Sequence, residues 1–313
     1  STSIAIAASE VRPDTTCITY LGGREENEVA SARNVASTLG LRHESLVCDP
    51  GRAYDRYLAL LPKLPLLTAD FAMLSYVDLA TEIAAHGGDG VIDGLGSDSY
   101  FGMPMNRQQR ILAALAKGIR LPRFVAELPF IDRSFRLCFG LSTLQMDPVE
   151  RIFPGSRFTD AEVDALFGRK IAAASKSRLA PFRSAIESVS SRDELKTMAI
   201  TIEEGSSAFA KGLYTTSALS LKSAYPFCDK TLREWVYRNV PLDQLMDRAT
   251  LTNKILVRRH IARHFSGLPY LERKGSFRFN LCGLARDRFD QVHAFALQGR
   301  DVLPGAAGWL ERN

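Results

Sequence analysis

The sequence has no cysteine arrangement that would build a metal site or a network of disulfides. Its five cysteines are odd in number, lie far apart and include no Cys-x-x-Cys pair. This spacing argues against metal ligation and against a disulfide framework. Each cysteine is best interpreted as a reduced, mostly buried small hydrophobic residue, and we expect a cytoplasmic protein. The five are Cys17, Cys48, Cys138, Cys228 and Cys282.

Long hydrophobic runs are also missing. No apolar run reaches the length that spans a bilayer, and no charged-then-apolar leader opens the chain, so we expect no membrane partner. Charge of one sign is not in strong excess, since 40 Lys and Arg residues against 35 Asp and Glu residues give a formal net charge of +5. Such a mild charge is typical of a solvated basic surface, and it is compatible with an anionic ligand.

The first part of the chain alternates between strand and helix patterns. Residues 15–21 are β-branched, short and bounded by turn signals, which predicts a buried strand, and residues 41–47 are predicted to form another strand. Residues 25–39 between them place apolar side chains at helical spacing. A second helix is predicted at residues 70–86, and it leads into a short strand at residues 90–92. This strand–helix–strand rhythm predicts a parallel sheet with right-handed crossovers.

Further along the chain the pattern changes to helices interrupted by proline and glycine. Helical spacing is found at residues 111–121, 158–174 and 193–213. The sequence shows no internal repeat and no low-complexity linker, so we expect this region to wrap onto the first part. We therefore predict an α/β, nucleotide-binding part at residues 1–106 and a helical part at residues 107–313 of the same domain.

A glycine turn follows the strand at residues 90–92. Gly94 and Gly96 let the backbone bend sharply and approach a ligand without a Cβ in the way, and the carboxylate of Asp98 follows. In an open α/β sheet, this is where a phosphate ligand and its metal bind. By itself, however, a Gly-x-Gly turn more often binds no ligand.

This segment resembles the Gly-Glu-Gly-x-Asp-Glu-x-Phe-x-Gly-Tyr motif of the asparagine synthetase C-terminal (synthase) domain family. The family is a branch of the ATP-pyrophosphatases that also contains β-lactam synthetase, carbapenam synthetase and lasso-peptide cyclases. Two positions depart from the motif, because Leu95 and Ser99 stand where asparagine synthetases carry Glu. The matching residues are Gly94, Gly96, Asp98, Phe101 and Gly102.

Other stretches carry the same resemblance in the same order, from Ser1 to about Phe277. Ser1 matches the last Ser of the family's pyrophosphate loop, Ser-Gly-Gly-x-Asp-Ser, so we expect the printed residues to begin just inside the ATP site. Upstream of Pro226, Lys222 and Ala224 replace the Glu and Arg of the family's Leu-Glu-x-Arg. The remaining matches are Asn27 to His43, Pro226 to Asp229, Lys254 to Arg259, and Lys274 with Phe277.

The resemblance implies a fold, a reaction and its cofactors. The fold would be a parallel-sheet, adenine nucleotide α-hydrolase-like core of the ATP-pyrophosphatase type, followed by a mostly helical region. ATP and Mg²⁺ would activate a small-molecule or peptide carboxylate as an acyl adenylate with release of pyrophosphate. An amine or ammonia would then displace AMP and form an amide. The resemblance also implies a candidate partner, an N-terminal glutaminase-like or precursor-binding domain that lies outside the printed residues.

The resemblance also assigns roles to individual residues. Asp98 would bind Mg²⁺, and Lys274 would stabilise the charge that develops when the adenylate is attacked. His43 is a lone histidine at a strand start, and we give it no catalytic role. The expected nucleotide-binding residues are Ser1, Gly94, Leu95 and Gly96, together with Thr19, Tyr20, Leu21 and Asp93 at the carboxyl ends of strands, where adenine and ribose should lie.

Two other functions remain open. A degenerate, non-catalytic homologue could serve as a binding or scaffold subunit, and four departures favour this reading: Leu95, Ser99, Lys222 and Ala224. Alternatively, an ATP-pyrophosphatase could act on a different acceptor, such as a tRNA base or a thiolation substrate. Composition alone predicts a solvated basic face at residues 254–278, which only partly has the interleaved aromatics of a nucleic-acid site, and we expect no nucleic-acid partner.

Overall fold

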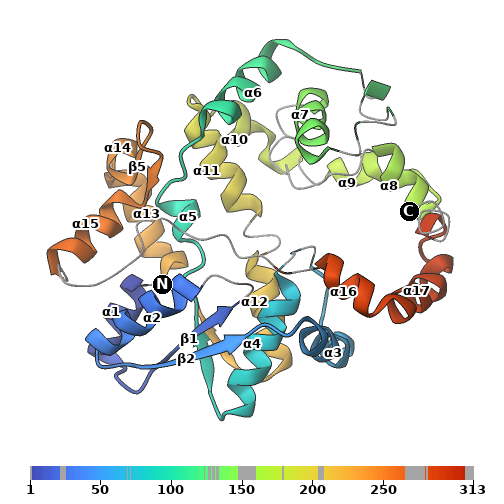
Figure 1. Ribbon diagram of the computed structural model, residues 1–313. Coiled ribbons are helices and arrows are strands. Elements are labelled where there is room, and N and C mark those ends of the chain that lie inside the picture. Colours follow the sequence, from blue (N-terminus) through green and yellow to red (C-terminus); the bar gives the residue numbers. More distant parts are fainter. Residues whose placement is uncertain are drawn as a thin grey trace. The chain divides into compact units, whose positions relative to one another are not determined.

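The protein is mixed α/β with mostly helical content in a computed structural model (Figure 1). Among the described helices, none is long and apolar enough to cross a membrane. The structure describes residues 2–21, 26–68, 70, 72–122, 124–125, 128, 131, 134–146, 160–177, 180–203, 208–264, 279 and 281–306. The chain divides into two compact units: unit 1 comprises Ser1–Gly102, Glu204–Asp247 and Thr252–Asp287, and unit 2 comprises Met103–Glu203, Arg248–Leu251 and Arg288–Asn313.

A parallel pair of strands lies in the first part of unit 1. β1 (Thr16–Leu21) pairs in parallel with β2 (Arg42–Val47) along its whole length. The connection contains α2 (Glu26–Thr38), which is followed by Gly40 with a left-handed φ of 69°. These two strands, the helix between them and the parallel pairing are as predicted, but β1 is only half-buried and not buried as expected. α1 (Thr2–Val11) precedes them and buries its Ile6 side chain in the core.

A second parallel pair precedes the glycine turn. β3 (Gly90–Ile92) pairs with β4 (Lys222–Ala224), a strand that the sequence did not predict. A Cβ on Gly90 would lie only 2.9 Å from the carbonyl oxygen of Lys222, so the close approach of the two strands requires glycine. A third, antiparallel pair joins β5 (Met246–Asp247) and β6 (Thr252–Asn253). The described strands thus form three two-stranded sheets, and the parallel ones are small.

The helices of unit 1 bury their apolar side chains against one another. α4 (Met73–Ala85) packs beside α3 (Pro50–Leu60) and α12 (Phe209–Ala218) (Figure 1). An apolar cluster around Phe101 and Phe227 lies beyond the glycine turn, and burying each such side chain contributes roughly 1.5–3 kcal/mol. The remaining helices are η1 (Leu61–Lys63), α5 (Ser97–Tyr100), η6 (Pro226–Cys228), α13 (Lys230–Asn239), α14 (Leu242–Leu245), α15 (Ile255–His264) and α16 (Leu281–Asp287).

Unit 2 is helical in its described residues. α6 (Arg107–Gly118) begins four residues before the predicted start, because Asn106 and Gln109 form a capping box there. After α6, the backbone N–H of Leu121 donates to the Leu144 carbonyl at 3.1 Å, which ties this segment to α7. The remaining elements are α7 (Phe135–Gln145), α8 (Asp160–Phe167), α9 (Ala172–Ser177), η4 (Ala180–Phe182), α10 (Arg183–Glu187), α11 (Arg192–Glu203), α17 (Phe289–Gln298) and η7 (Gly299–Asp301).

Two of the stretches predicted from helical spacing each contain two helices in place of one. The pattern at residues 158–174 is interrupted after α8 by Gly168, which has a left-handed φ of 63°. The carboxylate of Asp164 accepts two backbone N–H groups at the start of α9, which stabilises the interruption. The pattern at residues 193–213 falls on α11 and α12, which belong to different units, and residues 204–207 between them lie outside the described residues.

Candidate functional site

The glycine turn connects β3 to α5, and one of its positions can be occupied only by glycine. Asp93 extends the strand pairing by donating its N–H to the Ala224 carbonyl at 2.9 Å. The Asp93 carboxylate accepts the N–H of Leu95 at 3.0 Å, which closes a local turn. Gly96 has a φ of 89°, and a Cβ there would collide with the sulfur of Cys228. Both the conformation and the close contact therefore require glycine at this position.

Asp98 lies in the first turn of α5, directly after the glycine turn. Its Oδ1 atom is 2.8 Å from Nζ of Lys254, which precedes α15. The same oxygen accepts a hydrogen bond from Nδ2 of Asn253 at 3.1 Å. The side chains of Asp98 and Lys254 are only 14% and 20% exposed, so water screens their attraction less than it would at the surface. The structure therefore brings a cation and an amide donor to the predicted metal ligand.

The backbone of Lys254 is held in a strained conformation. Its φ of 57° is left-handed, which costs a non-glycine residue on the order of 1–3 kcal/mol. Its N–H donates to the Phe101 carbonyl at 3.3 Å, and its carbonyl accepts the N–H of Arg258 at 2.9 Å. These contacts hold the strained residue from both sides. Ser220 and Leu251 have the same φ of 57°, so the conformation does not by itself mark a functional position.

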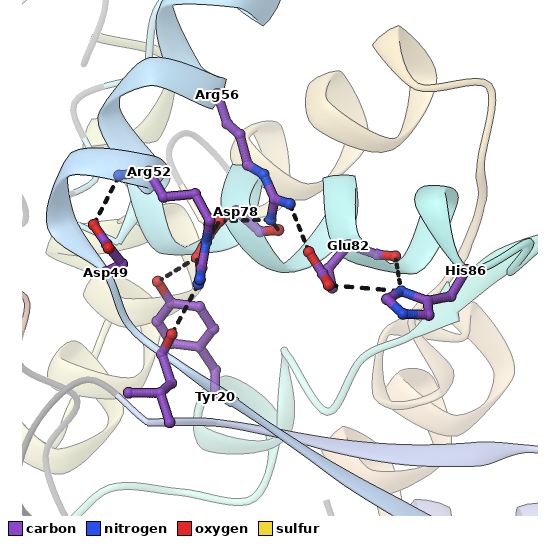
Figure 2. A network of polar contacts seen from close by, with 8 residues as sticks. Tyr20, Asp49, Arg52, Arg56, Asp78, Glu82 and His86 are labelled. Atoms are coloured by element: carbon purple, nitrogen blue, oxygen red, sulfur yellow. Dashed lines mark hydrogen bonds and ion pairs between the residues drawn. The ribbon is translucent and has the colours of Figure 1, made fainter.

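A second carboxylate lies where β1 and β2 end. Asp78 of α4 is fully buried, and Arg52 of α3 donates to both of its oxygens at 2.9 and 2.8 Å (Figure 2). Arg56 Nη1 and the Tyr20 hydroxyl donate to the same carboxylate at 2.7 and 3.0 Å. Arg52 also donates to the carbonyl of Val47, the last residue of β2, at 2.8 Å. The network thus ties the carboxyl ends of both strands to α3 and α4.

The charges in this network stabilise the ionised form of Asp78. Burial acts to raise the pKa of Asp78, but hydrogen bonds from Arg52 and Tyr20 outweigh it, and the pKa lies below its ordinary value. Burial, and next the Cys48 thiol, raise the pKa of Tyr20, so its phenol stays neutral and donates. The hydrogen bond to Asp78 raises the pKa of Arg52. All of these shifts favour the arrangement that Figure 2 shows.

Of the two carboxylates, Asp98 and not Asp78 is the candidate ligand for a Mg²⁺–nucleotide complex. The described residues contain no group of three His, Cys, Asp or Glu side chains that could hold a metal without further ligands. In nucleotide sites, Mg²⁺ is usually held by one or two carboxylates, with phosphates and water as the other ligands. Asp98 is partly exposed and follows the glycine turn, so it suits that role. Asp78 does not, since four hydrogen bonds already occupy its two oxygens and it has no exposed surface.

The predicted site residues fall into two described groups. Residues 93–98 form one turn, and the structure adds Lys254 to them. Thr19, Tyr20 and Leu21 end β1, in the other parallel pair. The Tyr20 hydroxyl faces Asp78, so its side-chain donor is used within the protein.

Among the other positions named from the sequence, His43 is described by the structure, and Ser1 and Lys274 are not. Thr19 Oγ1 lies 3.0 Å from Nε2 of His43, in a contact between the two parallel strands. Burial lowers the pKa of His43, which favours its neutral form. Ser1 and Lys274 lie outside the described residues, so their roles stay predictions.

The sequence did not predict two charged residues that take part in these contacts, Lys254 beside Asp98 and Asp78 in the arginine network. Lys254 was counted in a solvated basic face, although it opens a stretch that resembles the family's Lys-x-x-Leu-x-Arg helix. Asp78 was passed over within α4, although it lies four residues after Leu74 on the buried side of that helix. A charge at a core-facing position of an amphipathic helix was therefore the available signal.

Most of the chain matches one protein family. The family model of asparagine synthase matches residues 1–281 of the 313. The chain belongs to the asparagine synthase family. This confirms the resemblance inferred from the motifs and supports an ATP-dependent, ligase-like protein. A search of curated proteins finds no match to the chain. The matched residues of this asparagine synthase family member include the glycine turn, Asp98 and Lys254.

Proposed function

We propose that this asparagine synthase family member is an ATP-dependent ligase that forms amide bonds. A substrate carboxylate attacks the α-phosphorus of ATP, which gives an acyl adenylate and releases pyrophosphate. An amine or ammonia then attacks the acyl carbon, loses a proton and displaces AMP. The observation that carries the proposal is the Asp98–Lys254 pair directly after the glycine turn, in a chain of this family.

The described residues suit the first step because it redistributes negative charge among phosphate oxygens. A Mg²⁺ ion bound with ATP would neutralise part of that charge, with Asp98 as its ligand from the protein. Lys254 holds Asp98 at 2.8 Å and places a second positive charge beside it. The glycine turn allows close approach of the nucleotide, and Lys274 would add a cation at the reacting carboxylate. We further propose that β1 and the glycine turn belong to an ATP-pyrophosphatase-type core, with adenine and ribose near Thr19 to Leu21.

Leu95 distinguishes the second step from ordinary asparagine synthesis. Its side chain can neither accept a proton nor form a hydrogen bond, so the attacking amine must lose its proton elsewhere. General-base help is worth roughly 10²–10⁴-fold, and an acyl adenylate is reactive enough to proceed without it. Leu95 also makes the pocket more apolar at this point than a Glu would, which favours a specialised acceptor, with an amine larger than ammonia as the first candidate. Robust synthesis of asparagine from aspartate and ammonia would contradict this part of the proposal.

Exchange of labelled pyrophosphate into ATP tests the first step, with aspartate and short acidic peptides as trial carboxylates. Asp98→Asn and Lys254→Ala should each lower exchange by roughly 10²–10³-fold, since each removes a group acting on the phosphates. Lys230→Ala is the matched control, because the Lys230 side chain is 81% exposed. Normal exchange by Asp98→Asn would contradict the assignment of this carboxylate.

A second candidate is a non-catalytic subunit that binds Mg·ATP. It is favoured by β4, where Lys222 and Ala224 replace the Glu and Arg of the family motif beside the glycine turn. Such a subunit would bind Mg·ATP in a calorimetric titration but would support no exchange with any carboxylate. Exchange by the unmutated protein therefore excludes the subunit, and binding without exchange favours it.

A further inference from the structure

Asn253 connects Asp98 to an arginine of the next helix. It is the last residue of β6, and its Nδ2 atom donates to Asp98 Oδ1 at 3.1 Å. On its other side, Arg258 Nε donates to the Asn253 main-chain carbonyl at 2.9 Å. Nη2 of Arg258 lies 3.5 Å from the side-chain oxygen of Asn253. One guanidinium thus contacts both oxygens of the residue that contacts Asp98.

Arg258 and Asp98 together fix which way the Asn253 amide points. A guanidinium has five N–H donors and no acceptor, whereas the amide of an asparagine has an oxygen at one end and an NH₂ group at the other. Because Arg258 takes the oxygen end, the NH₂ end must face Asp98. The amide can therefore donate to the Asp98 carboxylate, and the reversed amide would repel both neighbours.

The same contacts determine the position of Lys254. Arg258 holds the carbonyl of Asn253, the residue immediately before the strained Lys254, and its own N–H donates to the Lys254 carbonyl at 2.9 Å. Asp98 Oδ1 then receives both the Asn253 amide and the Lys254 ammonium. Two donors on one oxygen restrict rotation of the carboxylate. The orientation of Asp98 is thus set by residues that precede and begin α15.

We propose that Asn253 and Arg258 are positioning residues that orient the Asp98 carboxylate for the Mg²⁺–nucleotide complex. This inference rests on the proposed function and adds to it two residues that act through Asp98. Residues that orient a metal ligand typically change metal affinity by 10- to 100-fold when they are replaced. Arg258→Lys keeps the charge but loses the planar fork that contacts both Asn253 oxygens.

Calorimetric titration with ATP, in MgCl₂ and separately in EDTA, tests this role. Arg258→Lys and Asn253→Ala should weaken binding of Mg·ATP by about 10- to 100-fold. Both should leave the affinity for metal-free ATP and the melting temperature near those of the unmutated protein. Arg259→Lys is the matched control, because Arg259 is the next residue on α15 and its side chain is exposed. It should bind Mg·ATP normally.

Three outcomes would overturn the inference, and they separate it from the proposed function. Mg·ATP binding by Arg258→Lys and Asn253→Ala at the level of the Arg259→Lys control contradicts the inference alone. Equal losses with and without Mg²⁺, together with a lower melting temperature, mean that the residues only support the fold. An unmutated full-length protein, with any residues upstream of Ser1 present, that binds no Mg·ATP contradicts the proposed function and the inference with it.

Discussion

Asp78 and Asp98 both lie in unit 1 and both face cations, but their surroundings differ. Asp78 has no exposed surface, and two arginines and a tyrosine donate four hydrogen bonds to its two oxygens. Asp98 keeps 14% of its side chain exposed, and Asn253 and Lys254 converge on one oxygen. The cations of Asp78 come from a regular helix, whereas the cation of Asp98 comes from a residue with a strained backbone.

This difference separates a structural carboxylate, Asp78, from the carboxylate that we propose as the metal ligand, Asp98. A buried ion whose hydrogen-bonding capacity is filled has nothing left to offer a ligand, and it stabilises the native arrangement of its neighbours. A partly exposed carboxylate after a glycine turn can exchange a contact for a metal or a nucleotide. The contrast can be tested by removing each carboxylate in turn.

The largest expected effect is on stability, from Asp78→Ala. The change leaves Arg52 and Arg56 without their shared anion, and breaking a buried ion pair in this way costs about 3–5 kcal/mol. We expect the low end, about 3 kcal/mol, because these arginine side chains are 35% and 23% exposed. Urea denaturation measures the loss. Asp98→Ala is the comparison and should cost less, because it leaves one lysine, and not two arginines, without this carboxylate. Equal losses for the two variants would contradict the division into structural and functional carboxylates.

The next effect is on binding, from Asp98→Asn. Removing the negative charge should weaken Mg·ATP binding at least about tenfold, since a direct ligand matters no less than the residues that orient it. Stability should fall by less than in Asp78→Ala, because asparagine keeps a side-chain oxygen that accepts hydrogen bonds. Calorimetric titration and urea denaturation on the same preparation measure both quantities. A loss of stability as large as that of Asp78→Ala, with binding intact, would reverse the roles of the two carboxylates.

The turn that holds Asp98 could be predicted because its signals are local. A short apolar strand, two glycines and a carboxylate within residues 90–98 are visible in sequence order, and the left-handed φ of Gly96 agrees with them. The partners of the turn could not be predicted this way. β4 is the three-residue segment Lys-Ser-Ala, which has no strand signal of its own, and it forms by pairing with β3.

Lys254 and Asp78 could not be assigned to their sites from the sequence for the same reason, because their partners lie far away in the chain. The pairing of Asp98 with Lys254 depends on how a hairpin and a helix far along the chain pack, and neither sequence segment encodes that alone. The Asp78 network likewise needs α3, α4 and both strand ends in place. The predicted bounds of two helices were wrong for a different reason. The side-chain cap at Asn106 and the left-handed Gly168 determine where these helices begin or end, and the apolar spacing does not.

A smaller effect on stability is expected when the pH is lowered. The pKa of Asp78 is lowered in the folded protein, so its contribution is present above the unfolded pKa of about 3.9 and is lost as pH falls through the lower folded value. The stability difference between the unmutated protein and Asp78→Asn should therefore be constant from about pH 5 to 7 and shrink below about pH 4. Urea denaturation at several pH values measures it. A difference that grows in acid would mean that the Asp78 pKa is raised.

The smallest effect should come from Tyr20→Phe, which removes one of the four hydrogen bonds to Asp78. A hydrogen bond to a charged group contributes roughly 1.5–3 kcal/mol, but the remaining arginine donors keep the carboxylate satisfied, so a loss of about 1 kcal/mol is expected. Because the Tyr20 hydroxyl points to Asp78 (Figure 2), its removal should leave ATP affinity unchanged even if the backbone at this strand end lies beside the ribose. Urea denaturation and calorimetric titration distinguish the two roles. A tenfold loss of ATP affinity at unchanged stability would assign the hydroxyl to the nucleotide and remove it from the structural network.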